Sequence, residues 1–168
     1  MSCNCKKNGT TSEPILTLTP GSTAANATYL MTTTHYLCGN RKVCANGNFP
    51  MSAKLDYQVL GLPVSVGNGA FCCEVLCTGQ IMYMPYRNGQ NTCGCCENYK
   101  NENVYFTMCI PCESAAVPTI TGGTVIVAPT DLTECKLVTN AVELTTSINV
   151  ATATATQGAN NNVSPTTK

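Results

Sequence analysis

The sequence predicts an all-β domain, and three observations lead to that expectation. Threonine, which favours strands over helices, occurs 25 times in 168 residues. Short runs of alternating apolar and polar residues recur along the chain, with Gly or Pro between them. No stretch keeps the 3.6-residue apolar period of an amphipathic helix. About eight to ten such strands are typical of a β-sandwich, of which the jelly roll is one topology; a partly open barrel is the alternative.

The strands expected in the first half of the chain share this alternation and end near Gly or Pro. They are Glu13–Gly21, Ala27–Gly39 and Lys54–Pro63. Two further runs, Ala70–Cys77 and Gly79–Tyr86, follow each other closely. Their junction at Thr78-Gly79 predicts either a hairpin or a bend in one long strand.

The second half supplies the remaining strands. In Asn103–Pro111, Val104 and Phe106 alternate with Tyr105 and Thr107, which predicts a strand with two different faces. The last strands are expected in Thr121–Pro129, Glu134–Val138 and Ala141–Thr156. We therefore divide the chain into a flexible cysteine-bearing arm (1–12), a single β domain (13–156) and a polar, low-complexity tail (157–168).

Charged residues are scarce, which limits the classes of function. Asp, Glu, Lys and Arg make up 11% of the chain and the formal net charge is zero, whereas about 25% charged residues is usual. A neutral, charge-poor surface resists association weakly, so copies of the chain itself are the expected partner, as a homo-oligomer or polymer. The seven lysines and two arginines form no basic stripe, so no nucleic-acid partner is expected.

No catalytic motif is present, and the chain is predicted not to be an enzyme. His35 is the only histidine, and Asp56 and Asp131 are the only aspartates. The phosphate-binding, dinucleotide-binding and zinc-protease motifs are absent from the sequence.

The N-terminus lacks the apolar region of a secretory signal, and no run of eighteen apolar residues would span a membrane. The chain is therefore expected to be made in the cytosol and to contact no membrane.

Thirteen cysteines are the distinctive feature, and eight lie between Phe71 and Cys112. Two CxxC pairs, Cys93 with Cys96 and Cys109 with Cys112, have the spacing of a four-cysteine structural zinc site. A zinc-stabilised β-rich binding module is therefore one hypothesis. The expected cofactor is either none or one structural zinc.

Disulfides within the chain are the competing interpretation of the same cysteines. A Cys96–Cys109 bridge would close the loop before a predicted strand, and a Cys38–Cys44 bridge would close the turn Gly39–Val43. His35, Cys38 and Cys44 could begin a second, less favoured metal site, which Cys72 or Cys77 would complete.

Disulfides between chains are the third interpretation. Cys3 and Cys5 precede every expected strand, so they are the best candidates to leave the domain. Cys72 and Cys73 are neighbours on a strand and should point to opposite faces, so one of them can bond outward. Cys135, alone among the late strands, is a further candidate, or else a buried thiol. Because thirteen is odd, complete pairing within one chain would leave one thiol over.

The opening MSCNC, the Cys72-Cys73 doublet, the missing signal peptide and the Thr/Asn-rich β pattern resemble cysteine-rich spore-surface proteins of Firmicutes, in particular endospore-appendage subunits. This resemblance implies a jelly-roll domain with a short arm that links neighbouring subunits. It also implies that Cys3 and Cys5 bond to cysteines such as Cys72, Cys73 or Cys135 of a neighbour.

The function expected from the sequence is a structural subunit that self-assembles into a disulfide-crosslinked filament or surface lattice. A decoration or fibre protein of a phage virion is the closest alternative. Either assembly would be built without a signal peptide and would function outside the cell after lysis, on a spore surface or a virion.

Overall fold

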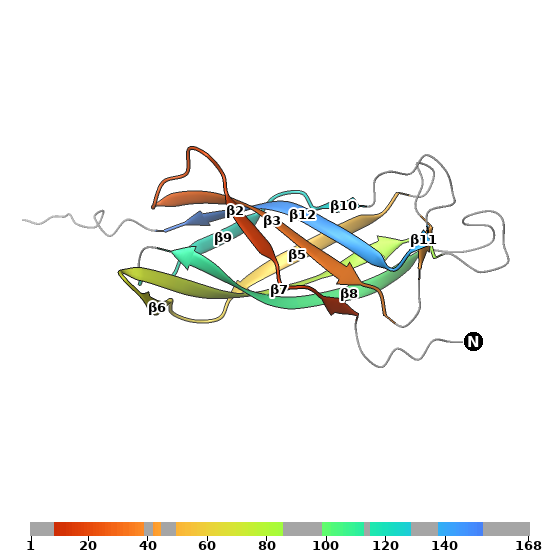
Figure 1. Ribbon diagram of the computed structural model, residues 1–168, viewed down its shortest axis with the longest axis horizontal. Helices are drawn as coiled ribbons and strands as arrows, with labels where there is room; N and C mark the ends of the chain where they lie inside the picture. Colours follow the sequence, from red (N-terminus) through yellow and green to blue (C-terminus); the bar gives the residue numbers. More distant parts are fainter. Residues whose placement is uncertain are drawn as a thin grey trace, which may run out of the picture.

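The computed structural model describes residues 9–38, 42–44, 50–85, 99–112, 115–128 and 138–152. Within these ranges there is no helix, and two larger antiparallel sheets pack together as a β-sandwich (Figure 1). The predicted all-β sandwich is confirmed. In the same ranges, no helix meets the length and hydropathy needed to cross a membrane.

The first sheet is built around β3 (Asn26–Tyr36) and β12 (Ala141–Ala151), which pair along their whole length. β-branched residues recur in both strands, as threonine in β3 and as Thr, Val and Ile in β12, and their side chains pack well on a pleated surface. Shorter strands extend the sheet on both sides: β1 (Thr10–Thr11) and β2 (Ile15–Leu18) pair with β3, and β9 (Thr119–Gly122) and β10 (Ile126–Ala128) pair with β12.

The second sheet is built around β7 (Ala70–Tyr83), the longest strand. On one side β7 pairs with β8 (Lys100–Cys112) in an unbroken register. On the other side it pairs with β5 (Ser52–Val59) and with β6 (Val64–Gly67). A small separate sheet joins β4 (Val43–Cys44) to β11 (Val138–Thr139).

Two expectations about strand boundaries change. Of the two alternatives at Thr78-Gly79, the hairpin is wrong and one long strand is confirmed, because β7 runs through both residues and pairs continuously with β5 and β8. Thr10 and Thr11 already form β1 opposite Tyr36 and His35, so ordered structure begins inside the segment expected to be the arm. The turn between β6 and β7 has positive φ angles at Gly67, Asn68 and Gly69, which glycine and asparagine tolerate best.

The core lies between the two sheets and follows the alternation of the strands. On β8 every second residue from Glu102 to Cys112 is buried and the residues between are exposed. The largest fully buried hydrophobic side chains are Tyr83, Met31, Ile81, Ile110, Leu144 and Ile148.

Contacts between the sheets define two opposite ends of the sandwich. At one end the Tyr29 hydroxyl of β3 donates to the Pro111 carbonyl of β8, at 3.3 Å. At the other end His35 of β3 contacts Glu102 of β8. We call these the Tyr29 end and the His35 end. Strand β6 lies at the Tyr29 end, and the described chain begins at Gly9 at the His35 end (Figure 1).

Candidate functional site

Strands β7 and β8 carry five cysteines, divided between the two faces of their sheet. Side chains alternate along a strand, so Cys72 and Cys109 lie on the outer face. Cys73, Cys77 and Cys112 lie on the inner face and are buried. The prediction that Cys72 and Cys73 point in opposite directions is therefore confirmed.

On the outer face, Cys72 and Cys109 are joined by a disulfide with a Cα–Cα distance of 5.5 Å. In the register Cys72 lies opposite Pro111 and Cys109 opposite Glu74, so the two cysteines are diagonal neighbours. The bridge spans a sequence separation of 37 residues. In the chain-entropy account, a cross-link of this span contributes about 4 kcal/mol by restricting the unfolded chain.

This bridge changes three expectations. Cys109 is bonded to Cys72 and not to Cys96, because the strand register brings those two sulfurs together. Cys72 is likewise paired within its own chain and has no free thiol to offer a neighbour. Cys73 was expected to offer an outward link, but it is fully buried.

The zinc interpretation also meets a geometric obstacle. Cys109 and Cys112 belong to one continuous strand, three residues apart, so their side chains point to opposite faces of the sheet. Two thiolates on opposite faces cannot grip one tetrahedral ion, and the Cys109 sulfur is already bonded. Among the described residues no group of three or more His, Cys, Asp or Glu side chains is arranged to hold a metal.

A groove of about 360 Å³ runs over the disulfide. Its walls come from β2 and the segment leading into it, from β6, and from β7 and β8. The lining residues are Glu13, Pro14, Leu16, Val64, Cys72, Glu74, Thr107, Met108 and Cys109. Cys109, Glu13 and Glu74 are exposed residues, so one half of the bridge and two acidic residues line one groove.

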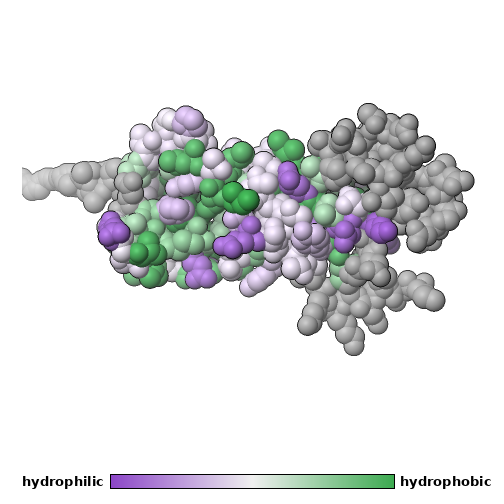
Figure 2. Space-filling view, in the orientation of Figure 1, coloured by the Kyte–Doolittle hydropathy of each residue, from purple (hydrophilic) through white to green (hydrophobic). Residues whose placement is uncertain are grey.

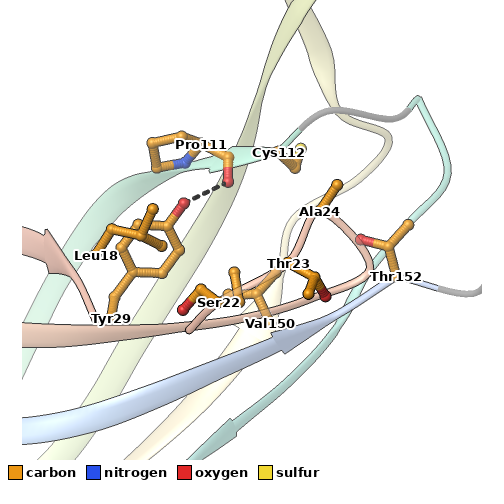
Figure 3. Close-up of a pocket in the computed structure, with 10 residues that line it drawn as sticks. Leu18, Ser22, Thr23, Ala24, Tyr29, Pro111, Cys112, Val150 and Thr152 are labelled. Atoms are coloured by element: carbon orange, nitrogen blue, oxygen red, sulfur yellow. Dashed lines mark hydrogen bonds between the residues drawn. The ribbon is translucent and has the colours of Figure 1, made fainter. Parts of the chain in front are cut away.

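A second, smaller pocket of about 120 Å³ opens between the sheets at the Tyr29 end (Figure 3). Leu18, Tyr29 and Val150 form its apolar wall, and Pro111 and Cys112 close it from β8. Figure 3 shows the hydrogen bond from Tyr29 to the Pro111 carbonyl across this opening. The disulfide groove and this pocket therefore flank the same end of β8, one on each face.

The cysteines on the inner face are buried in the core, which keeps their thiols protonated. Burial raises the pKa of Cys77 from 9.0 to about 12, and burial together with nearby Cys112 raises the pKa of Cys73. Burial, with Cys77 adding to it, also raises the pKa of Tyr57, its cross-strand partner, to about 12. These groups are neutral in the folded protein at neutral pH and are not poised as nucleophiles.

Alkaline pH is therefore expected to destabilise the fold. Below pH 9 both the folded and the unfolded chain keep Cys77 protonated, so the raised pKa has no effect. Between pH 9 and about 12 the unfolded chain releases this proton first, and the free energy of unfolding falls as pH rises. Urea melts at pH 8, 9 and 10 check this expectation. A Cys77→Ala variant should lose less stability over the range, and an equal loss would contradict the assignment.

The His35 end carries a buried polar network that sequence reasoning missed. His35 is fully buried and contacts Glu102, while its Nδ1 lies 2.8 Å from the Thr11 hydroxyl. The other oxygen of Glu102 accepts the Cys38 backbone N–H at 2.9 Å. The signal was present in the alternation of β8, since the phase set by Val104 and Phe106 places Glu102 inside as well.

The same network contacts the start of the described chain at Gly9. A Cβ at Gly9 would lie 2.7 Å from Glu102 Oε2 and 2.8 Å from His35 Nε2, so the main chain packs directly on the pair. A hydroxyl, an imidazole and a carboxylate in line can activate a nucleophile. Here the imidazole has no exposed surface, so we interpret the network as structural, and as an anchor for the main chain at Gly9.

The remaining candidate cysteines are placed only in part. Cys38 is disulfide-bonded, and its partner side chain is not among those described, so the Cys38–Cys44 pairing stays a prediction. Cys44 is described only through its backbone in β4. The other predicted residues lie outside the described ranges: Cys3, Cys5, Cys93, Cys96 and Cys135.

Comparison with known proteins gives no relative for this fold and these cysteines. No family model, no curated protein and no solved structure matches the chain.

Proposed function

We propose that this protein is a structural subunit, without catalytic activity, that assembles with copies of itself into a filament or surface lattice. The observation that carries the proposal is a stretch of exposed hydrophobic side chains at the Tyr29 end. Leu62 is 74% exposed, Val64 65% and Val66 64%. Figure 2 shows hydrophobic residues at the end of the molecule where β6 lies and also along the middle of this face. Exposed hydrophobic side chains that lie close together on a surface often mark an interaction site.

The strand edges support the same proposal. Within the described residues, the 13-residue strand β8 pairs with β7 only, so its other edge has no strand partner there. The short strand β6 is exposed along all four residues. Open edges of this kind accept a further strand from another chain, and the low charge of the surface opposes such contacts weakly.

The two ends of the sandwich differ, which bears on symmetry. The exposed hydrophobic stretch lies at the Tyr29 end, and the chain enters at the His35 end. A contact between unlike ends is heterologous, and such contacts propagate into open filaments unless the rotation closes a ring. Cross-linking through Cys3 and Cys5 of the arm would make this assembly covalent, as the resemblance to spore-appendage subunits implies.

The double variant Val64→Thr/Val66→Thr is expected to weaken assembly without destabilising the monomer. Both side chains are exposed, so their replacement removes no core contact, whereas each valine buried between subunits contributes about 1.5 kcal/mol or more. We expect the association constant to fall about tenfold or more. Sedimentation velocity and electron microscopy under reducing conditions measure the non-covalent step alone.

Val117→Thr is the matched control, because Val117 is also exposed, at 46%, but lies outside the β6 stretch. It should assemble like the parent protein. A parent protein that stays monomeric at all concentrations, with or without reductant, would contradict the proposed function.

A further inference from the structure

The outer face of the first sheet is the broader outer surface of the sandwich and carries almost no charge. Alternate residues of β3 and β12, and of the shorter strands beside them, point away from the core and form this face (Figure 1). In the strands of this sheet, Glu143 is the only Asp, Glu, Lys or Arg residue. The outer face of the second sheet carries Lys54, Asp56 and Glu74. The two outer faces are therefore suited to different contacts.

The strand register places hydroxyl and hydrophobic side chains in two adjacent rows at the centre of the first face. Across β2, β3, β12 and β10, the partners in one row are Ile15, Thr32, Thr145 and Ile126. Across β2, β3 and β12, the partners in the next row are Thr17, Leu30 and Ser147. We call the residues of these two rows the threonine patch. Ile15 is 68% exposed, Ile126 60% and Leu30 45%, so the patch leaves three large hydrophobic side chains in contact with water.

The face around this patch is large enough for a stable contact. Strand spacing and rise give β3, β12 and the strands beside them an area of about 600 Å² in projection, to which the relief of the side chains adds. Stable protein–protein interfaces cover about 800 Å² on each partner. The centres of interfaces are depleted of charged residues, and polar groups surround them. Glu143, two residues from Thr145 along β12, lies at the margin of the patch and not within it.

A second copy of the same face is the partner that this chemistry fits. Threonine and serine hydroxyls both donate and accept hydrogen bonds, so a patch that contains them can satisfy an identical patch. Because the patch contains no charged residue, no like charges meet at its centre. The smaller Thr32 and Thr145 lie between the two isoleucines of their row. Leu30 of one copy can fill that space on the other copy.

We propose that two copies pack face to face through the threonine patch about a two-fold axis, an inference that rests on the proposed self-assembly. Such a contact is isologous, so each copy contributes the same residues. Two sheets that pack in this way lie about 10 Å apart, as they do within a sandwich. The hydrophobic stretch at the Tyr29 end continues a filament, whereas this contact joins two filaments side by side. The assembly is therefore two subunits wide.

Leu30→Lys in the full-length protein tests this contact. Each two-fold contact then loses two leucines and gains two like charges, so its association constant should fall about tenfold or more. In electron micrographs with reductant, the parent assembly should be two subunits wide and the variant assembly one. Because Leu30 points away from the core, urea unfolding of the dilute variant should match that of the dilute parent. Leu30→Thr, which adds no charge, should weaken the contact less.

Met82→Lys is the matched control, because Met82 is a 37% exposed hydrophobic residue on the outer face of the second sheet. It should assemble like the parent protein. A mixture of Leu30→Lys and Leu30→Glu should recover the pairing, because opposite charges then face each other across the axis. Pairing of Leu30→Lys at parental strength, or an equal loss in Met82→Lys, would overturn the inference. So would a mixture that pairs no better than either variant alone.

Failure of this contact and failure of the proposed function give different results. Val64→Thr/Val66→Thr weakens the contact at the Tyr29 end and should leave discrete pairs held by the threonine patch. A parent assembly that is one subunit wide and that Leu30→Lys leaves unchanged keeps the proposed function and loses this inference. A parent protein that stays monomeric at all concentrations loses both.

Discussion

Replacing Glu102 with alanine is expected to lower the free energy of unfolding by about 3–5 kcal/mol. Glu102 is 6% exposed and His35 is fully buried, so removal of the carboxylate leaves the imidazole without its partner inside the core. The Cys38 backbone N–H, which donates to Glu102 Oε1, loses its acceptor at the same time. A buried polar group without a partner costs about 1–3 kcal/mol on its own.

The double variant His35→Leu/Glu102→Met tests the cause of this loss. If the damage in Glu102→Ala comes from an unpaired buried group, then replacing both partners with apolar residues should restore much of the stability. Recovery should stay incomplete, because the Cys38 N–H remains without an acceptor. Glu143→Ala, on the exposed face of β12, serves as the control and should change stability by less than about 0.5 kcal/mol.

Urea unfolding measures these differences, and hydrogen exchange shows where they act. In Glu102→Ala the backbone amides of β1 should exchange faster than those at the Tyr29 end, because the Thr11 hydroxyl hydrogen-bonds His35 and β1 pairs with β3 beside it. A loss in Glu102→Ala no larger than that in Glu143→Ala would show that the network contributes nothing to stability.

The sequence predicted correctly those features that depend on a single strand, such as which side chains share a face. The alternation of Val104 and Phe106 with Tyr105 and Thr107 matches the buried and exposed faces of β8, and the Cys72-Cys73 doublet divides between faces as expected. These results need only the two-residue period of a strand, which is a local property. The all-β class follows from many such runs together.

The pairing of cysteines could not be predicted, because it depends on register between strands. Cys72 meets Cys109 only because Glu74 lies opposite Cys109, and that offset is a property of the whole β7–β8 pair. The CxxC spacing of Cys109 and Cys112 wrongly suggested two ligands of one zinc ion. That interpretation assumes a tight turn, whereas the chain forms an extended strand there. The groove depends on still more distant neighbours, because Pro14 and Val64 approach the bridge from other elements.

Gly79→Ala is expected to destabilise the protein by about 3 kcal/mol or more. A Cβ at this position would lie 1.8 Å from the Lys54 carbonyl oxygen and 3.0 Å from Leu55 Cδ2. Gly79 lies opposite Leu55 in the β5–β7 ladder, so relief of the clash requires β5 itself to move. This close approach also explains why Thr78-Gly79 continues one long strand, since glycine there lets β5 pack tightly.

Two other glycines turn this prediction into an ordered series. At Gly122 a Cβ would lie 2.3 Å from the Tyr57 ring, a side chain that can shift, so the cost should be smaller than at Gly79. At Gly123 the nearest atoms, both of Ser147, are 3.7 and 3.8 Å away, which is ordinary contact, so Gly123→Ala should be nearly neutral. Chemical denaturation should rank the losses Gly79, Gly122, Gly123. The Lys54 carbonyl is part of the backbone and cannot rotate away as a ring can, so Gly79→Ala should also speed hydrogen exchange throughout β5. If Gly79→Ala proves neutral, β5 does not keep this close approach in solution.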